Sequence, residues 1–372
     1  MQSWRAFHIY TSRVTPLILD CVTPFLEKRG AELENRSWER HYVGGSHLRL
    51  RLKGSEEALS SVGDELVAEV EAYLEANPSP DAEDYSPRRV ANLLAQEKVS
   101  IEGLDLSYRN NVVEEHPYPA HQGVFHSDGA AQIMDDFRHD VLPLATAILR
   151  DPGPRWEIAL RFFFLQALAV GGTLKNGSVS WRSHWEGFSA SFSSTAVIDR
   201  VRESFVAQRD EIIRHLEEVE TLHAEGRLDE DPFLGPWWQL VQDYGKRARH
   251  DLKEGVQFTV QPKDAEQAKE MRQQTQDLLR RQSEFVRTFW SSEKFLTAIQ
   301  HEPRMQVPRI LTNLLYSLLS MIEIKPIEKM ALCHHSHRAV EDYYDCDLQE
   351  VLKENMRWME SRHADRWEEA RG

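Results

Sequence analysis

The chain has 372 residues, with 45 Lys and Arg against 60 Asp and Glu, a net charge of −15 and 41% hydrophobic residues. This composition is typical of a soluble globular protein of one large or two modest domains, and it excludes disordered, collagen-like and membrane-spanning classes; the acidic balance also argues against nucleic-acid binding, which depends on Lys and Arg. Three cysteines and an N-terminus without a secretory signal pattern predict a cytoplasmic protein without disulfides.

The first 125 residues predict an antiparallel sheet. Gly44-Gly45 joins a hairpin, because glycine adopts the positive φ angles of tight turns. Apart from a short extra helix before the last strand, the order β-α-β-β-α-β is that of a ferredoxin-like unit with two helices on one face. We expect strands over residues 3–10, 37–43, 46–53 and 106–114, and helices over 16–30, 56–74 and 88–96.

From residue 126 onward the hydrophobic pattern is helical, with few strand signals. We therefore predict an α+β fold: a single domain of residues 1–372, with a strand-containing subdomain at 1–125 and a mainly helical subdomain at 126–372. We expect helices over residues 133–149, 155–170, 195–219, 239–253, 265–288, 308–322, 326–341 and 348–363.

The segment from Ser46 to Lys53 alternates leucine with basic or imidazole side chains. Alternate residues of a strand face opposite sides, so His47, Arg49, Arg51 and Lys53 share one face. Arginines on a rigid strand suit recognition of carboxylates or peptide oxygens, and histidine transfers protons near neutral pH. The same pattern also fits a solvent-facing edge strand protected by charge, and both interpretations stay open here.

Residues 178–188 are rich in hydroxyl and aromatic side chains around His184. Ser183 is either a proton donor or the N-cap of a helix that begins there. The segment has no Gly-x-Ser-x-Gly turn and no Ser-His-Asp order, so a hydrolase triad is not indicated.

Two later helices carry further candidates. Thr312 and Tyr316 lie one turn apart, as do Asn313 and the serine four residues after it, so these polar groups either line a cavity or satisfy nearby backbone carbonyls. Cys333 and His337 have the same spacing and could supply two metal ligands. The remaining ligands of a zinc site are missing, so we expect an ordinary helix surface and no metal.

Several of these segments resemble the small, split lantibiotic-dehydratase C-terminal family, also called the thiopeptide-type bacteriocin biosynthesis domain. The resemblance spans nearly the whole chain; it is most specific in the hairpin strand and loosest in the helical half. It rests on WRAFHIY at 4–10, VGGSHLRLR at 43–51, RSHWE at 182–186 and LTNLLY at 311–316, followed by Pro326 and Leu332-Cys333.

The resemblance implies one of two chemistries on a ribosomal precursor peptide, neither of which uses a metal or organic cofactor. One subgroup eliminates glutamate from glutamylated Ser or Thr to leave dehydroamino acids. The other joins two dehydroalanines by a formal aza-[4+2] cycloaddition, and loss of water and of the leader peptide then leaves a pyridine in a macrocycle.

Departures from the elimination subgroup favour the second chemistry. That subgroup normally carries a further arginine in an Arg-Tyr-Gly-Gly stretch and a late histidine before Asn-Arg-Leu, and residues 118–124 and 308–314 contain neither feature. Elimination must remove an α-proton and stabilise a departing carboxylate, so both losses count against it. Cycloaddition depends more on positioning, and tyrosine, serine and histidine suffice for its proton movements.

The sequence thus predicts a cofactor-independent pyridine synthase, with glutamate elimination or a non-catalytic peptide-binding scaffold as alternatives. The expected partner is a precursor peptide with a leader segment, not nucleic acid or a membrane, and a homodimer stays open. The residues expected to handle protons are Tyr316, Ser183, His184 and His47. The residues expected to bind the peptide are Arg49, Arg51, Lys53, Trp185, Thr312 and Asn313.

Overall fold

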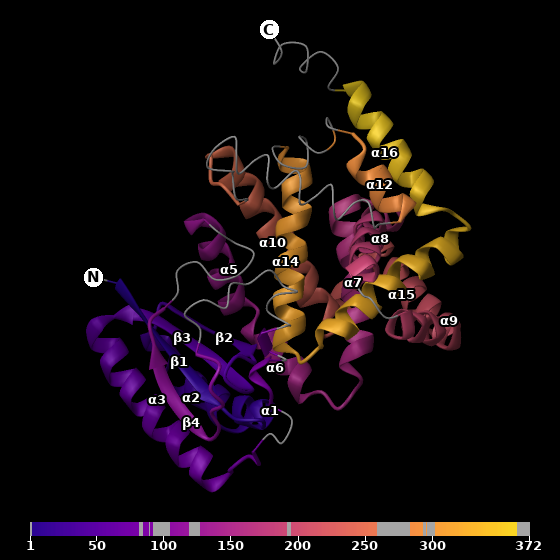
Figure 1. Cartoon of the computed structure of the whole chain (residues 1–372). Coiled ribbons are helices and arrows are strands. Elements are labelled where there is room, and N and C mark those ends of the chain that lie inside the picture. Colours follow the sequence, from indigo (N-terminus) through magenta and orange to yellow (C-terminus); the bar gives the residue numbers. More distant parts are fainter. Residues whose placement is uncertain are drawn as a thin grey trace. The chain divides into compact units, whose positions relative to one another are not determined.

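The computed structural model describes residues 2–81, 85–88, 90–91, 105–118, 127–191, 195–258, 283–292, 295 and 302–362 (Figure 1). The chain divides into two compact units. The sheet unit contains residues 1–153 and 317–323, and the helical unit contains residues 154–316 and 324–372. The two stretches of each unit are therefore separated in the sequence.

The sheet unit has four antiparallel strands, β1 (Gln2–Tyr10), β2 (Asn35–His41), β3 (His47–Ser55) and β4 (Val112–His116). Their order in the sheet is β2-β3-β1-β4, so β3 pairs on both sides. This is the strand order of a ferredoxin-like unit, and the expected α+β class is confirmed. The alternative of β3 as a solvent-facing edge strand is wrong.

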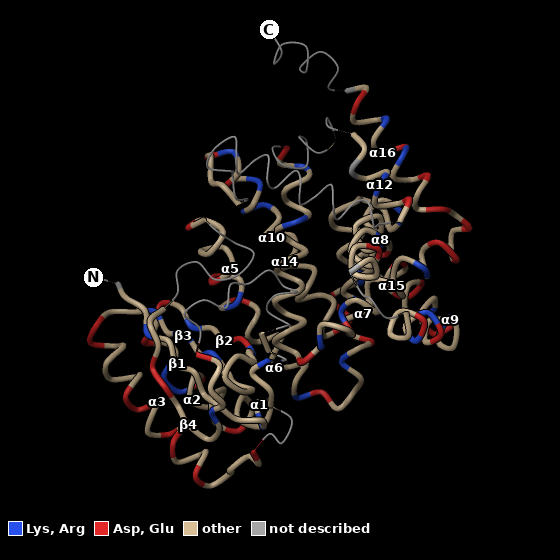
Figure 2. The backbone as a smooth tube through the Cα atoms, viewed as in Figure 1, with Lys and Arg blue, Asp and Glu red and all other residues tan. Residues whose placement is uncertain are grey.

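One face of this sheet is apolar. Leu48, Leu50 and Leu52 of β3 are fully buried, as are Phe7 and Ile9 of the neighbouring β1. The helix α3 (Glu56–Ala76) packs on β1, β3 and β4, and Ser55 caps its N-terminus by accepting a hydrogen bond from the Ala58 backbone N–H at 3.2 Å. Acidic residues lie along α3, which carries many of the red segments of this unit (Figure 2).

The connection between β1 and β2 is helical, and two more helices follow β4. The first connection comprises α1 (Val14–Leu17), a π-helical turn (Ile18–Val22), α2 (Thr23–Arg29) and a 3₁₀ turn (Gly30–Glu32). The later helices are α5 (Asp128–Asp140), which contacts β2, and α6 (Leu142–Arg150).

The hairpin between β2 and β3 uses both glycines at positive φ, 80° for Gly44 and 121° for Gly45. A Cβ at Gly45 would lie 2.6 Å from the backbone oxygen of Arg109, so this position excludes a side chain on steric grounds too. The Arg109 backbone N–H donates to the Gly44 oxygen at 2.7 Å. The turn is thus fastened to the segment before β4.

The helical unit is built around α8 (Leu174–Ser191), which packs mainly against α7, α12, α15 and α16. Its core is aromatic, since Phe162, Phe163, Phe164 and Trp181 are fully buried. The described helices are α7 (Arg155–Gly171), α8, α9 (Thr195–Ala224), α10 (Leu234–Lys253), α12 (Glu284–Trp290), α14 (Pro303–Met321), α15 (Pro326–Tyr344) and α16 (Leu348–Arg362), with a 3₁₀ turn at Leu228–Glu230.

A sharp turn joins α7 to α8. Gly172 ends α7 in the left-handed conformation, with φ of 68°, and Gly177 brings α8 so close that a Cβ there would lie 2.1 Å from the Ala167 backbone oxygen. In the part of the chain that the structure describes, no single helix is long and apolar enough to cross a membrane; α7 and α8 meet that test only as a pair bent by 115°.

Several sequence-based boundaries need correction. The expected helix over residues 133–149 is two helices, because Pro143 starts a new one in the first turn of α6. The last strand begins at Val112 and not near residue 106, since the chain before it makes a loop in which Asn111 has φ of 52°. Ser183 lies in the middle of α8 and is not an N-cap. Most of the helices expected over residues 88–96 and 265–288 lies outside the described residues.

Candidate active site

The second face of the sheet is polar and carries the basic strand. Arg51 lies opposite Ala6 of β1 and Ser37 of β2, and Arg49 lies opposite His8 of β1 and Glu39 of β2. The alternation of β3 thus places the side chains as the sequence predicted, leucines on one face and basic groups on the other. The Arg51 side chain is buried, since only 5% of it is exposed to solvent.

Glu39 is the centre of an arginine cluster on this polar face. Its Oε2 lies 2.5 Å from Arg138 Nη2 of α5, and its Oε1 accepts a hydrogen bond from Arg51 Nη2 and lies 3.7 Å from Arg49 Nη1. Burial alone would raise the pKa of Glu39, but the adjacent guanidinium groups, Arg138 first, lower it far below its ordinary value. Glu39 is therefore ionised at neutral pH, and three arginines share one carboxylate.

A second acidic group lies beside this cluster. Asp135 of α5 accepts a hydrogen bond from the Tyr118 hydroxyl group, and its Oδ1 lies 3.9 Å from Arg138 Nη1. Burial raises the pKa of Asp135 and that of Tyr118. Among the residues that the structure describes, none accepts a hydrogen bond from the buried Arg51 Nη1, so this cluster contains one cationic donor without an acceptor.

His47 is oriented by both of its ring nitrogens. Nδ1 lies 2.9 Å from the Gly45 backbone oxygen, which can only accept, so Nδ1 carries the proton and Nε2 accepts from Arg49 Nε at 3.3 Å. Burial, followed by the charge of Arg49, lowers the pKa of His47 to about 4. This geometry suits a residue that orients Arg49 better than one that carries a proton.

Aromatic rings extend the same face beyond His47. The His47 ring lies 4.5 Å from that of Tyr10 and 5.0 Å from that of His8, and His8 stacks on His116 at 4.0 Å between ring centroids. Burial and the nearby arginines lower the pKa of His8 to about 2. The polar face therefore combines the neutral imidazoles of His8 and His47 with permanent guanidinium cations.

The helical unit contains a separate cluster around Tyr316 of α14. The Tyr316 hydroxyl group is hydrogen-bonded to His184 Nδ1 of α8 and lies 3.4 Å from Cys333 Sγ of α15. Lys329, one turn before Cys333, places its Nζ 4.5 Å from the centroid of the Tyr316 ring. His184 and Tyr316 both keep part of their surface exposed, while Cys333 is fully buried.

The side chains of His184, Tyr316 and Cys333 are all neutral in the pH range of the cell, mainly because they are buried. Burial, then the charges of Lys329 and Arg309, lowers the pKa of His184 to about 4. Burial raises the pKa of Tyr316 well above 10 and that of Cys333 to about 12. A neutral imidazole and a neutral phenol in contact can together accept a proton at one atom and donate one at another.

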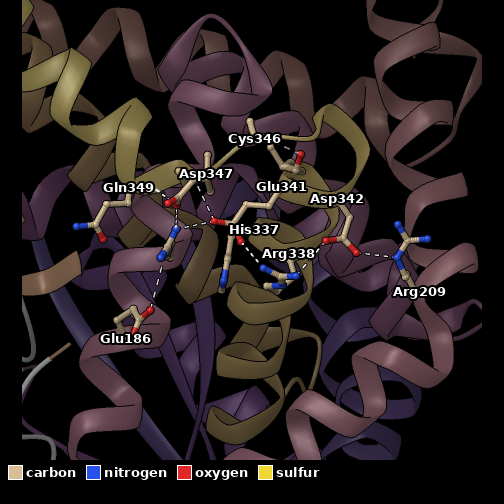
Figure 3. A network of polar contacts seen from close by, with 12 residues as sticks. Glu186, Arg209, His337, Arg338, Glu341, Asp342, Cys346, Asp347 and Gln349 are labelled. Carbon is tan, nitrogen blue, oxygen red and sulfur yellow. Dashed lines mark hydrogen bonds and ion pairs between the residues drawn. The ribbon is translucent and has the colours of Figure 1, made fainter. Parts of the chain in front are cut away.

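A polar network joins α8 to α15 (Figure 3). Arg182 Nη1 lies 2.6 Å from both Glu341 Oε1 and Asp347 Oδ1, and Glu341 Oε2 accepts from Arg338 Nη1 at 2.9 Å. Glu341, which is 7% exposed, therefore joins two arginines that come from different helices. Figure 3 shows it between Asp347 and Arg338.

The other residues expected at the site are distributed as follows. Trp185 is 3% exposed and packs edge-on against His334 at 4.7 Å, so it belongs to the core of the helical unit. Thr312 is buried, Asn313 is half-buried and Ser183 is half-buried in α8. Lys53 lies over the Trp4 ring at 5.8 Å.

The expectation of an ordinary helix surface at Cys333–His337 is wrong, because every residue from Cys333 to His337 is buried. The His337 Nδ1 atom is 2.9 Å from the backbone oxygen of Cys333 on its own helix, and Cys333 Sγ contacts Tyr316. Their polar groups are thus used within the protein interior.

Sequence reasoning missed Glu39, Arg138 and the role of Cys333 beside Tyr316. Glu39 could have been predicted from the sequence, because the hairpin turn at Gly44-Gly45 sets the strand register and so places Glu39 opposite Arg49. Arg138 gives no such signal, because only the packing of α5 on β2 brings it to the sheet. The contact between Cys333 and Tyr316 likewise depends on how α14 and α15 pack.

Comparisons with known proteins extend this description. The sequence profile of a family described as the lantibiotic biosynthesis dehydratase C-terminus matches residues 4–340. The pyridine synthase TbtD from thiomuracin biosynthesis is similar in structure, with a TM-score of 0.72, 21% identity and coverage of 92% of this chain and 99% of that chain. TsrL is similar with a TM-score of 0.69, 16% identity and coverage of 95% and 98%. Among curated protein sequences, none matches this chain.

These structural similarities extend over nearly the full length of each protein, so the sheet unit and the helical unit both have counterparts in the two solved structures. The sequence profile covers the basic strand, His184 and Tyr316 in one continuous match. The chain therefore belongs to the lantibiotic biosynthesis dehydratase C-terminal family.

Proposed function

We propose that this protein is an enzyme of ribosomal-peptide maturation, a pyridine synthase that joins two dehydroalanines of a precursor peptide. The family membership and the fold shared with TbtD support the proposal, and the observation that carries it is the neutral pair of His184 and Tyr316. The reaction makes a six-membered nitrogen ring by a formal aza-[4+2] cycloaddition. Loss of water and of the leader peptide then gives the aromatic pyridine.

The first task of such an enzyme is to convert a peptide amide into its iminol form, which serves as the azadiene. In this step the amide nitrogen loses a proton and the carbonyl oxygen gains one, so no net charge is transferred. Tyr316 donates its hydroxyl proton to the oxygen, and His184 accepts the proton from the nitrogen and returns one to Tyr316. Because both groups are neutral at rest, neither must first be ionised.

The later steps reuse the same groups. After the two bonds of the ring have formed, water leaves from the carbon that carried the iminol oxygen, and this departure requires a proton on that oxygen. Loss of the leader peptide as an amide requires a proton on the leaving nitrogen and removal of one from the ring. Tyr316 as acid and His184 as base supply both movements.

The arginine cluster of the sheet unit is assigned to peptide binding. Arg51 has a buried donor to which no described residue offers an acceptor, and peptide carbonyl oxygens or a side-chain carboxylate are the acceptors that a guanidinium group prefers. His47 orients Arg49 in this proposal. Ser183 stays a predicted proton donor, and Lys53, Thr312 and Asn313 stay predicted peptide contacts. Trp185, which was also expected to contact the peptide, is buried and supports α8 from within the core.

The partner proposed for this enzyme is a ribosomally made precursor peptide with a leader segment, processed in the cytoplasm without a metal or organic cofactor for the reaction. A surface with a net charge of −15 gives no broad electrostatic attraction to acidic peptides. Leader recognition therefore depends on shape and apolar contacts, and removal of the leader should abolish conversion of the core peptide.

Glutamate elimination is the second candidate, because one observation favours it. Arg138 brings a third guanidinium group to Arg49 and Arg51, and a cluster with more cations than carboxylates would stabilise a departing glutamate. The sequence analysis indicated that this chain lacks one arginine that the elimination subgroup carries. Arg138 of α5 brings a different arginine to the same cluster. The two chemistries differ in substrate, which allows a direct test.

The test is to incubate the full chain with two versions of one precursor peptide and to analyse the products by mass spectrometry. A peptide with two suitably spaced dehydroalanines should lose its leader and gain the heterocycle, while the glutamylated peptide should stay unchanged. Conversion of the glutamylated peptide to dehydroalanine would overturn the assignment in favour of elimination. No conversion of either peptide would contradict both enzymatic functions.

A pair of variants tests the role of the hydroxyl group. Tyr316→Phe removes a proton donor from the reacting atoms and should lower the rate by roughly 10²- to 10⁴-fold. Tyr343→Phe is the matched control, because Tyr343 is 38% exposed on α15 and should leave the rate unchanged. Equal rates for the two variants would exclude Tyr316 as the acid.

A further inference from the structure

We infer that Glu157, Glu211 and His215 form a binding site for a divalent cation of the zinc class between α7 and α9. Each of these residues offers one ligand atom, and the three atoms all lie within 4.8 Å of one another. Glu157 is in the first turn of α7, and Glu211 and His215 are one turn apart on α9, which packs against α7. A cation there would join two helices of the helical unit.

The donor set and its geometry suit such an ion. Zinc takes one imidazole nitrogen and two carboxylate oxygens at about 2.0–2.2 Å, with water completing the shell, so its ligand atoms lie roughly 3–4 Å apart. His215 Nε2 is already 3.7 Å from Glu157 Oε2. Glu211 is 53% exposed, and its side chain is therefore able to close the remaining distance.

His215 supplies the independent observation that the cluster is built for a ligand. Its side chain is 6% exposed, and its Nδ1 is buried without a hydrogen bond to any residue that the structure describes, although Glu218 Oε2 lies 3.4 Å away. A neutral imidazole that binds a metal through one nitrogen usually points its other N–H at a carboxylate. Metal binding through Nε2 would place the proton on Nδ1, where Glu218 is ready to accept it.

Arg214 is the cation that balances these carboxylates when no metal is bound. Its Nη2 lies 3.4 Å from His215 Nε2 and 3.7 Å from Glu211 Oε1, and its Nη1 lies 2.5 Å from Glu218 Oε1. Figure 2 shows basic and acidic segments together on α9. Because the Arg214 side chain is 51% exposed, it can swing into solvent and leave Nε2 to a metal ion. Arg214 and the metal would therefore compete for one site.

The experiment measures zinc binding to the full chain after treatment with EDTA, by isothermal titration and by the thermal unfolding midpoint. ZnCl₂ should bind with one-to-one stoichiometry and raise the midpoint by a few degrees, because a ligand that binds only the folded state stabilises it. MgCl₂ at the same concentration should change nothing, since magnesium disfavours imidazole. His215→Gln and Glu157→Gln should each weaken binding at least ~10-fold.

Arg214→Met gives the sharpest result, because removal of the competing cation should tighten zinc binding several-fold. His250→Gln, at an exposed histidine of α10, should leave binding unchanged. If His215→Gln does not fold, Glu211→Gln tests the same site at an exposed position. Unchanged binding in these ligand variants, weaker binding in Arg214→Met, or no binding to the unmodified chain would each overturn the inference. No readout involves turnover, so the result is independent of the proposed function.

Discussion

Acidification should destabilise this protein at pH values at which most of its carboxylates are still ionised. His47, His334 and His335 are each at most 5% exposed, and burial lowers their pKa values to about 4, 3 and 4. In the unfolded chain each titrates near its ordinary pKa of about 6.5. Below that value the unfolded state binds protons that the folded state does not, so stability is complete above about pH 6.5 and is lost as the pH falls toward the folded pKa values.

The size of the effect follows from the number of protons. At pH 5.5 a histidine with a folded pKa of about 4 and an unfolded pKa of about 6.5 loses about 1.2 kcal/mol of folding free energy relative to neutral pH. Three such groups lose about 4 kcal/mol, which is a large part of the roughly 5–15 kcal/mol by which domains are stable. Between pH 6.5 and pH 5 these three groups alone give a slope that approaches three protons, about 4 kcal/mol per pH unit, and His8 and His184, whose pKa values are lowered in the same way, steepen it further.

Urea unfolding followed by tryptophan fluorescence at a series of pH values from 7.5 to 5 measures this slope. His335→Asn, which keeps a polar group near Ser204 Oγ, should reduce the slope by about one proton, whereas His250→Asn on the surface should leave it unchanged. A free energy of unfolding that stays flat between pH 7 and pH 5.5 would refute the reasoning, because it would mean that these histidines are protonated in the folded state.

Three further outcomes are expected. Arg51→Leu should cost about 3–5 kcal/mol of stability, because it leaves the buried Glu39 carboxylate with fewer cations, and the double variant with Glu39→Gln should cost less than the sum of the single changes in a double-mutant cycle. Lys329→Met should move the acidic limb of the kcat/KM profile to higher pH, since removal of a nearby cation raises the pKa of the imidazole that it faces; an unmoved limb would separate Lys329 from the proton-transfer step. Gly177→Ala should destabilise strongly through its contact with backbone atoms of α7, whereas a Cβ at Gly245 of α10 would lie 3.7 Å from its nearest described neighbours, an ordinary contact distance, so Gly245→Ala should stabilise by up to about 1 kcal/mol; similar melting temperatures for the two variants would contradict the packing of α7 on α8.

The sheet unit was predictable in its order of elements because its signals are local. Alternating leucines define β3, and two glycines at positive φ define the hairpin, so strand pairing and side-chain faces follow from the pattern. The burial of Arg51 did not follow, because the same alternation also describes an exposed strand. Its interior position depends on β1 pairing with its other edge and on α5 packing near β2.

The helices and contacts of the helical unit were harder to predict from the sequence, because tertiary packing determines them. α8 contains glycine, serine and aromatic residues with modest helix propensity, and burial of Trp181 and Trp185 in tertiary contacts overrides that preference. His184 and Tyr316 were selected as candidates by residue type, and only the packed helices show that they touch. The spacing of 132 residues between them contains no information about that contact.

The sheet unit is discontinuous, and this has a consequence for synthesis on the ribosome. Residues 317–323 belong to it, where Arg138 Nε donates to Ser317 Oγ at 3.2 Å, Arg40 Nε donates to the Met321 backbone oxygen at 3.1 Å and Thr15 donates to Glu323 at 2.9 Å. Domains usually fold as they emerge, from the N-terminus onward. Here the nascent sheet must wait for more than 160 further residues before its last contacts can form. A stop codon after residue 153 would therefore release an incomplete unit, and nascent chains should gain protease resistance late, only when Glu323 has left the exit tunnel.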